Sequence, residues 1–212
     1  LALDDQTLLG DLLARVDQLD TYTAVWATEG VGYYYAERAK NTGQSTHHLL
    51  SAKAVSTLPA RYMIALHAGL GLSLAQQYLG QLPYAASKHE LDRTIRRFMA
   101  HCCSAAQPGY APVSFEALGL VTRLLYPQWV ETIDRILATS TPDQAVFWHG
   151  VGRGLYFLPT NVLPSSHSAA NVLKNLLAEA PHDVARLNAI SGLAWPLSLV
   201  NIYHPEVMEA FL

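Results

Sequence analysis

Charged residues are scarce in this sequence of 212 residues. Asp, Glu, Lys and Arg make up 15% of the residues and hydrophobic residues make up 50%, whereas an average soluble domain carries about 25% charged residues. The 14 basic residues form no run, the net charge is −3 and the pI is near 6.3. A nucleic-acid-binding protein normally shows a basic stripe and a high pI, so that class is excluded. The shortage of charge predicts extensive burial, inside the chain or against a partner.

Cysteine and the common catalytic motifs are also scarce. Cys102 and Cys103 are adjacent and are the only cysteines, so there is neither a disulfide framework nor zinc-finger spacing, and we expect a reducing, cytoplasmic compartment. The Gly-x-Ser-x-Gly elbow of hydrolases and the His-Glu-x-x-His metal motif do not occur. We therefore predict no catalytic residue, no metal ligand and no cofactor, which favours a non-enzymatic protein without settling the question.

Long hydrophobic runs are interrupted. The stretches 62–87 and 187–203 contain no Asp, Glu, Lys or Arg, but both contain polar residues such as His67 and Asn188. The apolar core of each is shorter than the roughly 20 residues that a membrane span needs. Buried helices are the favoured interpretation, while peripheral membrane attachment around Leu70 stays open as a disfavoured alternative.

The pattern that is present is helical. No segment alternates polar and apolar residues between hairpin turns as a sheet would require. Ser87 with Glu90 and Thr141 with Gln144 form capping-box patterns, which mark helix starts. We expect pairs of helices, whose first members cover about 4–20, 46–56, 86–106, 127–139 and 166–180 and whose second members cover about 21–40, 59–79, 112–126, 142–157 and 181–203. The chain starts with Leu1 and 207–212 reads as an unfinished helix, as in a processed product or a part of a longer chain.

A short phrase of small residues, here called the glycine phrase, returns about every forty positions. Its occurrences are Glu29-Gly30-Val31-Gly32, Ala68-Gly69-Leu70-Gly71, Glu116-Ala117-Leu118-Gly119, His149-Gly150-Val151-Gly152 and Ser191-Gly192-Leu193-Ala194. Each falls in the second helix of a pair. The sequence therefore predicts one all-α domain over 1–212, with about five helical hairpin repeats stacked as an α-solenoid or a closed α/α toroid. Glycine inside a helix costs about 1 kcal/mol relative to alanine, so we expect close helix packing at the phrase, or, as the alternative, a flat ligand pressed on the backbone.

The fourth phrase extends to Gly150-Val151-Gly152-Arg153-Gly154-Leu155-Tyr156-Phe157, and Gly192-Leu193-Ala194 follows with Pro181 between them. This arrangement resembles a bacterial family of unknown function whose members often accompany enediyne polyketide biosynthesis genes. That family has a Gly-x-Gly-Arg-x-Leu-aromatic-Phe stretch followed by Gly-Leu-Ala. The resemblance implies a glycine-rich helical fold and brings no established activity or catalytic residue.

The first position of the phrase carries the polar candidates Glu29, Glu116 and His149. Stacked repeats would place them along one line, where they could cap helices, bond between helices or bind a metal. Arg153 lies between two glycines, and we expect an internal ion pair with Glu29 or Glu116, or a clamp on a carboxylate or phosphate.

The aromatic candidates for a contact surface are Tyr33, Trp148 and Tyr156, because Tyr and Trp are enriched at interfaces. Tyr33 begins a run of three tyrosines, of which at least one is expected to face away from the core. Core packing is the simpler interpretation of all of them.

The sequence thus favours a non-catalytic scaffold or interaction subunit that binds a protein partner or forms a homo-oligomer, within a larger assembly. The alternative is a protein that binds a small hydrophobic ligand or a metal, or a tailoring enzyme, with a pocket among the glycine-rich helices. Its residues would be Glu29, Glu116, His149, Arg153, Tyr33, Trp148 and Tyr156.

Overall fold

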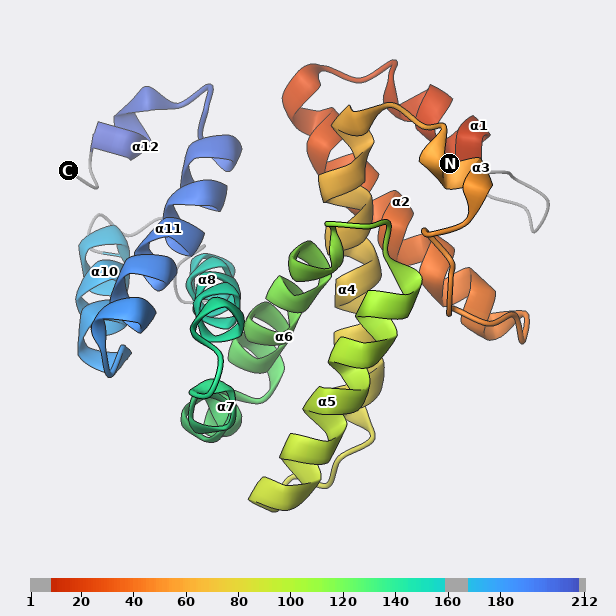
Figure 1. Cartoon of the computed structure of the whole chain (residues 1–212). Coiled ribbons are helices and arrows are strands. Elements are labelled where there is room, and N and C mark those ends of the chain that lie inside the picture. The colour runs from red at the N-terminus through yellow and green to blue at the C-terminus, as the bar shows by residue number, and fades with distance from the viewer. Residues whose placement is uncertain (1–8, 159–167, 210–212) are drawn as a thin grey trace. The chain divides into compact units, whose positions relative to one another are not determined.

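The computed structural model describes residues 9–158 and 168–209, and within those ranges every regular element is helical (Figure 1). The prediction of an all-α fold is confirmed. The elements are α1 (Leu9–Val16), α2 (Thr21–Asn41), α3 (Lys53–Ser56), η1 (Ala60–Tyr62), α4 (Met63–Gly80), α5 (Lys88–Ala105), α6 (Ala111–Leu125), η2 (Pro127–Trp129), α7 (Val130–Leu137), α8 (Thr141–Tyr156), α10 (Ser168–Glu179), α11 (Asp183–Val200) and α12 (Pro205–Glu209). The expected helix start near residue 4 and the end of the chain after 209 lie outside the described residues.

One of the two predicted capping boxes forms. The Ser87 amide donates to Glu90 Oε2 at 2.8 Å, and the Glu90 amide donates back to Ser87 Oγ at 3.3 Å, as the motif requires. The box at Thr141 is wrong. Helix α8 starts one residue earlier than that box implies, with Ser140 as its N-cap, and the Gln144 side chain is engaged by Asp134 instead.

The helix predicted over 46–56 is also wrong for most of its length, because only the four residues of α3 are helical. The chain before α3 lies against the end of α5. The amides of His48 and Leu50 donate to the carbonyls of Ser104 and Ala105 at 3.1 and 2.9 Å. Those carbonyls belong to the last turn of α5, which has no partners within the helix. The loop before α3 therefore satisfies part of its backbone hydrogen bonding through α5 and not through a helix of its own.

The contacts within the chain divide it into two compact units. Unit 1 contains the described residues up to Ala86 together with Arg93–Ser114, and unit 2 contains Ser87–Asp92 together with the described residues from Phe115 onward. We describe each unit by itself, and the single domain over 1–212 stays a prediction.

In unit 1, helices α2 and α4 lie side by side along much of their length (Figure 1). The contact depends on two glycines that have no room for a side chain. A Cβ on Gly32 would lie 2.9 Å from the carbonyl carbon of Leu66, and a Cβ on Gly69 would lie 2.5 Å from the Tyr33 amide and 3.0 Å from the Glu29 carbonyl carbon. Real Cβ atoms essentially never come closer than 3.0 Å, so the two backbones touch directly.

The same kind of contact joins α4 to the start of α6, still within unit 1. A Cβ on Gly71 would lie 2.7 Å from the Cα of Ser114. The Ser114 hydroxyl donates to the carbonyl of His67 at 2.8 Å, which reinforces the approach of the two helices.

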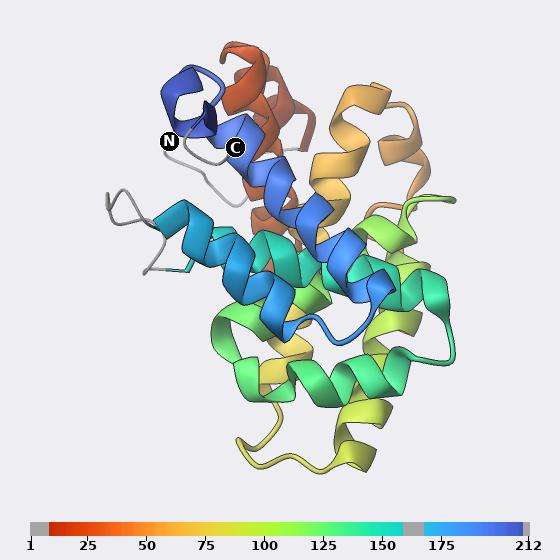
Figure 2. The same cartoon turned by 90° about the vertical axis from the view of Figure 1, so that its left-hand side faces the viewer.

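Unit 2 contains backbone contacts of the same kind, between α6, α8 and α11. Figure 2 shows α10 beside α11, and both contact α8. A Cβ on Gly150 would lie 3.0 Å from the carbonyl carbon of Glu116 on α6. A Cβ on Gly152 would lie 2.6 Å from that of Ala189 on α11, and one on Gly192 would lie 2.7 Å from that of His149 on α8.

These contacts share one register. The glycine at the fourth position of a phrase meets the backbone two residues before the next phrase, at Leu66, Ser114, Phe147 and Ala189. The glycine at the second position meets the first-position carbonyl of the preceding phrase, at Glu29, Glu116 and His149. The expectation that the phrase glycines serve close helix packing is confirmed at seven of them: Gly32, Gly69, Gly71, Gly119, Gly150, Gly152 and Gly192.

Most of the uncharged stretch at 62–87 forms α4, and most residues of that helix are buried. Among the described helices, none combines the length and apolarity that crossing a membrane would take.

Candidate functional site

Three of the predicted site residues meet between α6 and α8. Glu116 Oε1 lies 3.0 Å from His149 Nδ1, and Glu116 Oε2 accepts from Arg153 Nη1 at 2.9 Å. His149 and Arg153 stand one helical turn apart on α8, which brings both side chains to one carboxylate. Of the two predicted partners of Arg153, Glu29 and Glu116, these contacts show Glu116.

The trio is held inside unit 2. The Arg153 side chain is 5% exposed and that of Glu116 is 12% exposed, whereas His149 is 33% exposed. The Arg153 guanidinium also lies 4.8 Å from the ring centre of Trp195 on α11, within the range of a cation–π contact. The arginine thus ties α6, α8 and α11 together where the glycines bring those helices close.

The ionisation of Glu116 follows from these partners. Burial is the largest influence and by itself raises the pKa of the carboxyl. The hydrogen bond to His149 and the positive charge of Arg153 outweigh it, so the pKa lies below its ordinary value. Glu116 is therefore an anion at neutral pH, held by a hydrogen bond with His149 and an ion pair with Arg153. A buried carboxylate paired in this way has a structural role in joining α6 and α8.

Glu29 lies in the other unit, on α2, where it is buried and its carbonyl faces Gly69 of α4. Among residues 9–158 and 168–209, no three His, Cys, Asp or Glu side chains are grouped so as to hold a metal ion. Cys102 is buried and Cys103 is exposed, and both are free.

The aromatic candidates lie in three different places. Tyr33 donates to Gln76 Oε1 at 2.9 Å, which links α2 to α4. The Tyr156 hydroxyl accepts from Asn201 Nδ2 at 2.9 Å. All three tyrosines of the run that begins at Tyr33 are half-buried, and the expectation that at least one of them faces away from the core stays a prediction.

Trp148 belongs to a polar cluster that the sequence analysis missed. Its Nε1 donates to Asp134 Oδ1 at 2.6 Å, and the same oxygen accepts from Gln144 Nε2 at 2.8 Å. His182 Nδ1 accepts from the Ala185 amide at 3.1 Å, and its Nε2 lies 3.1 Å from Asp134 Oδ1 and 3.0 Å from Gln144 Nε2. This cluster joins α7, α8 and the start of α11.

A signal for the cluster is present in the sequence. The buried stripe of α7 consists of Val130, Ile133, Asp134 and Leu137, which is the i, i+3, i+4, i+7 spacing of a core face. A carboxylate on such a stripe has to find donors inside the protein.

A second missed cluster lies in unit 1 around His101. Its ring stacks on that of His47 at 4.0 Å, and it contacts the hydroxyls of Thr46 at 2.9 Å and Tyr78 at 3.1 Å. Burial, together with the charge of His47, lowers the pKa of His101 to about 4. The ring is therefore neutral at physiological pH and fastens the loop before α3 to α5.

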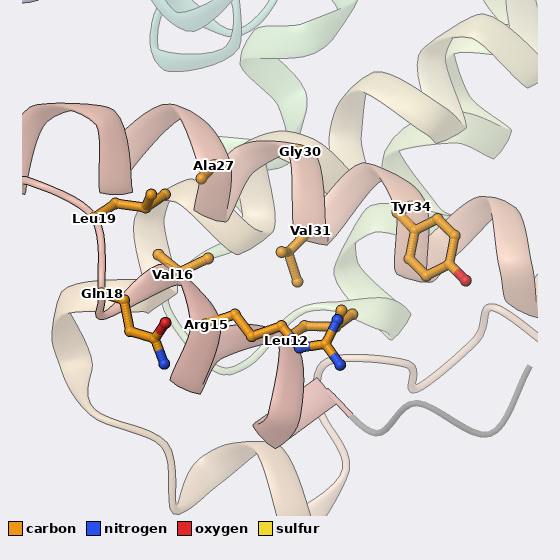
Figure 3. A pocket seen from close by; sticks show the side chains of 9 residues that line it. All are labelled: Leu12, Arg15, Val16, Gln18, Leu19, Ala27, Gly30, Val31 and Tyr34. Carbon is orange, nitrogen blue, oxygen red and sulfur yellow. The ribbon is translucent and has the colours of Figure 1, made fainter. Parts of the chain in front are cut away.

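Unit 1 also contains a pocket of about 830 Å³ between α1 and α2 (Figure 3). We call it the α1–α2 pocket. It is lined by Leu12, Arg15, Val16, Gln18, Leu19, Ala27, Gly30, Val31 and Tyr34. Most of this surface is apolar, with Arg15, Gln18 and Tyr34 as its polar residues, and Leu19 is 43% exposed.

Gly30 distinguishes this pocket from the other phrase positions. It is a second-position glycine, but a Cβ on it would meet no described atom within 4 Å. The equivalent Gly69, Gly150 and Gly192 all lie against a neighbouring backbone. No packing among the described residues accounts for the glycine at position 30, and sequence alone gives no means of separating it from the other three.

No protein-family model, no curated protein and no solved structure matches this chain. The function has therefore to be inferred from the geometry above.

Proposed function

We propose that the protein is a non-catalytic interaction subunit that binds a protein partner through the α1–α2 pocket. The observation that carries the proposal is the exposed Gly30 in that pocket. At three other second positions the glycine admits a neighbouring helix backbone, and a helix of a partner would use the open one in the same way. We also propose that the helix pairs form a repeat array, either an α-solenoid or a closed α/α toroid.

The contacts of the charged candidate residues support a structural role for those residues. Glu116, His149 and Arg153 are engaged with one another, and the phrase glycines other than Gly30 that lie in helix contacts serve packing. The resemblance to the enediyne-associated bacterial family is in keeping with this proposal, because that family brings no established activity. A cytoplasmic location is proposed on the free cysteines alone.

The test is site-specific photo-crosslinking in cells that naturally produce the protein. A benzophenone side chain replaces Gln18, which is exposed and lines the pocket, and in a control it replaces Tyr84, which is 80% exposed in the same unit and does not line the pocket. We expect a discrete crosslinked protein from position 18 and none from position 84. Equal labelling at both positions, or none at either, contradicts the proposal.

The apolar lining favours one second candidate, a small hydrophobic ligand in the same pocket with Arg15 or Tyr34 at its polar end. Native mass spectrometry and elemental analysis of protein purified without a metal-affinity step test it. A retained organic molecule or a stoichiometric metal would favour the ligand-binding or tailoring-enzyme alternative. The mass of the bare chain would contradict tight retention of a ligand.

A further inference from the structure

Among the described residues, no contact uses the two ends of the glycine register, and the two ends are complementary. On α2, a Cβ on Gly30 would meet no described atom within 4 Å, and Ala27, two residues before the phrase, is half-buried in the α1–α2 pocket. On α11, the fourth-position residue Ala194 and the first-position residue Ser191 are exposed. In every contact of the register, a fourth position meets the backbone two residues before a phrase, and a second-position glycine meets a first-position carbonyl.

The exposed side of α11 has the character of a docking face. Leu187, Ile190, Ser191 and Ala194 follow i, i+3, i+4, i+7 spacing, so they share one side of the helix. Leu187 is 67% exposed and Ile190 is 38% exposed, and none of the four is charged. The opposite side, with Ala189, Gly192 and Leu193, is buried.

We propose that the occupant of the α1–α2 pocket is α11 of a second copy of this chain. Ala194 of that copy lies against the backbone of Ala27, and Gly30 lies against its Ser191 carbonyl. Leu187 and Ile190 supply the apolar surface that the pocket lining covers. The inference rests on the proposed function and names its partner.

Such an interface joins two different surfaces, so it is head-to-tail. A head-to-tail contact builds a ring if the rotation between copies closes and a filament if it does not. Each copy would continue the register of the one before, with Ala194 in place of the glycine that stands at the fourth position of the other phrases.

The experiment is sedimentation velocity over a concentration series of the full chain, with three variants. Gly30→Leu fills the pocket from a position where a Cβ meets no described atom within 4 Å. Gly10→Leu is the matched control, because Gly10 is also exposed and open but does not line the pocket. Ala194→Glu blocks the other surface. Circular dichroism verifies that all three variants are folded.

We expect the wild-type chain and Gly10→Leu to associate beyond the dimer, or to close as one ring, as concentration rises to about 0.1 mM, a range that includes weak specific interfaces. Gly30→Leu and Ala194→Glu should each raise the dissociation constant by at least about tenfold, the cost expected when a side chain overpacks a fitted contact. Mixed in equal amounts, these two variants should form a dimer and nothing larger, because each keeps one working surface.

Three results would overturn the inference. The wild-type chain could remain monomeric over the whole series, Gly30→Leu could associate as the wild type does, or the mixed variants could fail to pair. A monomeric chain whose position 18 crosslinks to a different protein leaves the proposed function standing and removes only the second copy as partner.

Discussion

Substitution of a packed phrase glycine should destabilise the protein, although alanine is the better helix former. In Gly192→Ala, the new Cβ would lie 2.7 Å from the carbonyl carbon of His149 and closer still to its oxygen, where ordinary contact begins at 3.4 Å. The obstacle is backbone on α8, which cannot rotate away as a flexible side chain can. Helix α11 must therefore move outward along a contact that also carries the buried Arg153.

The magnitude follows from two opposed terms. Overpacking a fitted contact costs about 1–3 kcal/mol, and the upper end applies because the clash is with backbone. Alanine returns up to about 1 kcal/mol of helix propensity. The net loss should be about 2 kcal/mol, equivalent to a fall in Tm of roughly 4–8 °C for a chain of this size.

The matched control is the same substitution at Gly30, where no described atom lies within 4 Å of the new Cβ. Only the propensity term remains there, so Gly30→Ala should raise the Tm by about 1–4 °C. Both variants are followed by thermal unfolding with circular dichroism at 222 nm. If Gly192→Ala melts at or above the wild-type temperature, or if the two variants shift alike, the account of the glycine register is refuted.

Three further predictions concern the buried polar groups. Glu116→Gln leaves the guanidinium of Arg153 without its anion and should cost about 3–5 kcal/mol in urea unfolding. Because the pKa of Glu116 is lowered in the folded state, its contribution to stability is present above about pH 4 and is lost as the pH falls through the folded value. The wild type should therefore lose more stability than the variant as the pH falls through that window. The pKa of His101 is about 4 in the folded protein and about 6.5 in the unfolded chain. The unfolded chain therefore binds more protons between these two pH values, so the free energy of unfolding should rise from about pH 4 to about pH 6.5. An NMR titration of the His101 ring with a midpoint near 6.5 would contradict this. Asp134→Ala leaves the indole N–H of Trp148 and the side-chain amide of Gln144 without their acceptor and should cost about 1–3 kcal/mol of stability. The loss should appear as a lower midpoint in urea unfolding and a red-shifted tryptophan emission. If neither changes, the cluster is not needed for stability.

The sequence predicted the helices that follow ordinary local rules. The capping residues at Ser87 placed the start of α5, and the spacing of the phrase placed every occurrence within a long helix. It failed at 46–56, because the backbone groups of that loop find partners on α5, far away in the chain. It failed again at Thr141, because Gln144 is used by Asp134 and not by its own helix end.

The candidate site shows the same division. Glu116, His149 and Arg153 were identified from their places in and beside the phrase, and α6 and α8 do bring them together. That the three satisfy one another could not be read from the chain, because it depends on how close two helix axes lie. His101 and His182 were missed because each is defined by partners from other helices.

What the sequence determined by itself is periodicity, which is a local property: helices where apolar residues recur with a turn's spacing, and small residues at fixed intervals along them. What only the tertiary structure decided is which small residues have a neighbour. Gly69, Gly150, Gly192 and Gly30 hold the same place in the phrase, yet the first three touch another backbone and the last meets no described atom. The difference is the presence or absence of a helix beside them, and the distance between helices is set by packing across the fold and not by the residues on either side of a glycine.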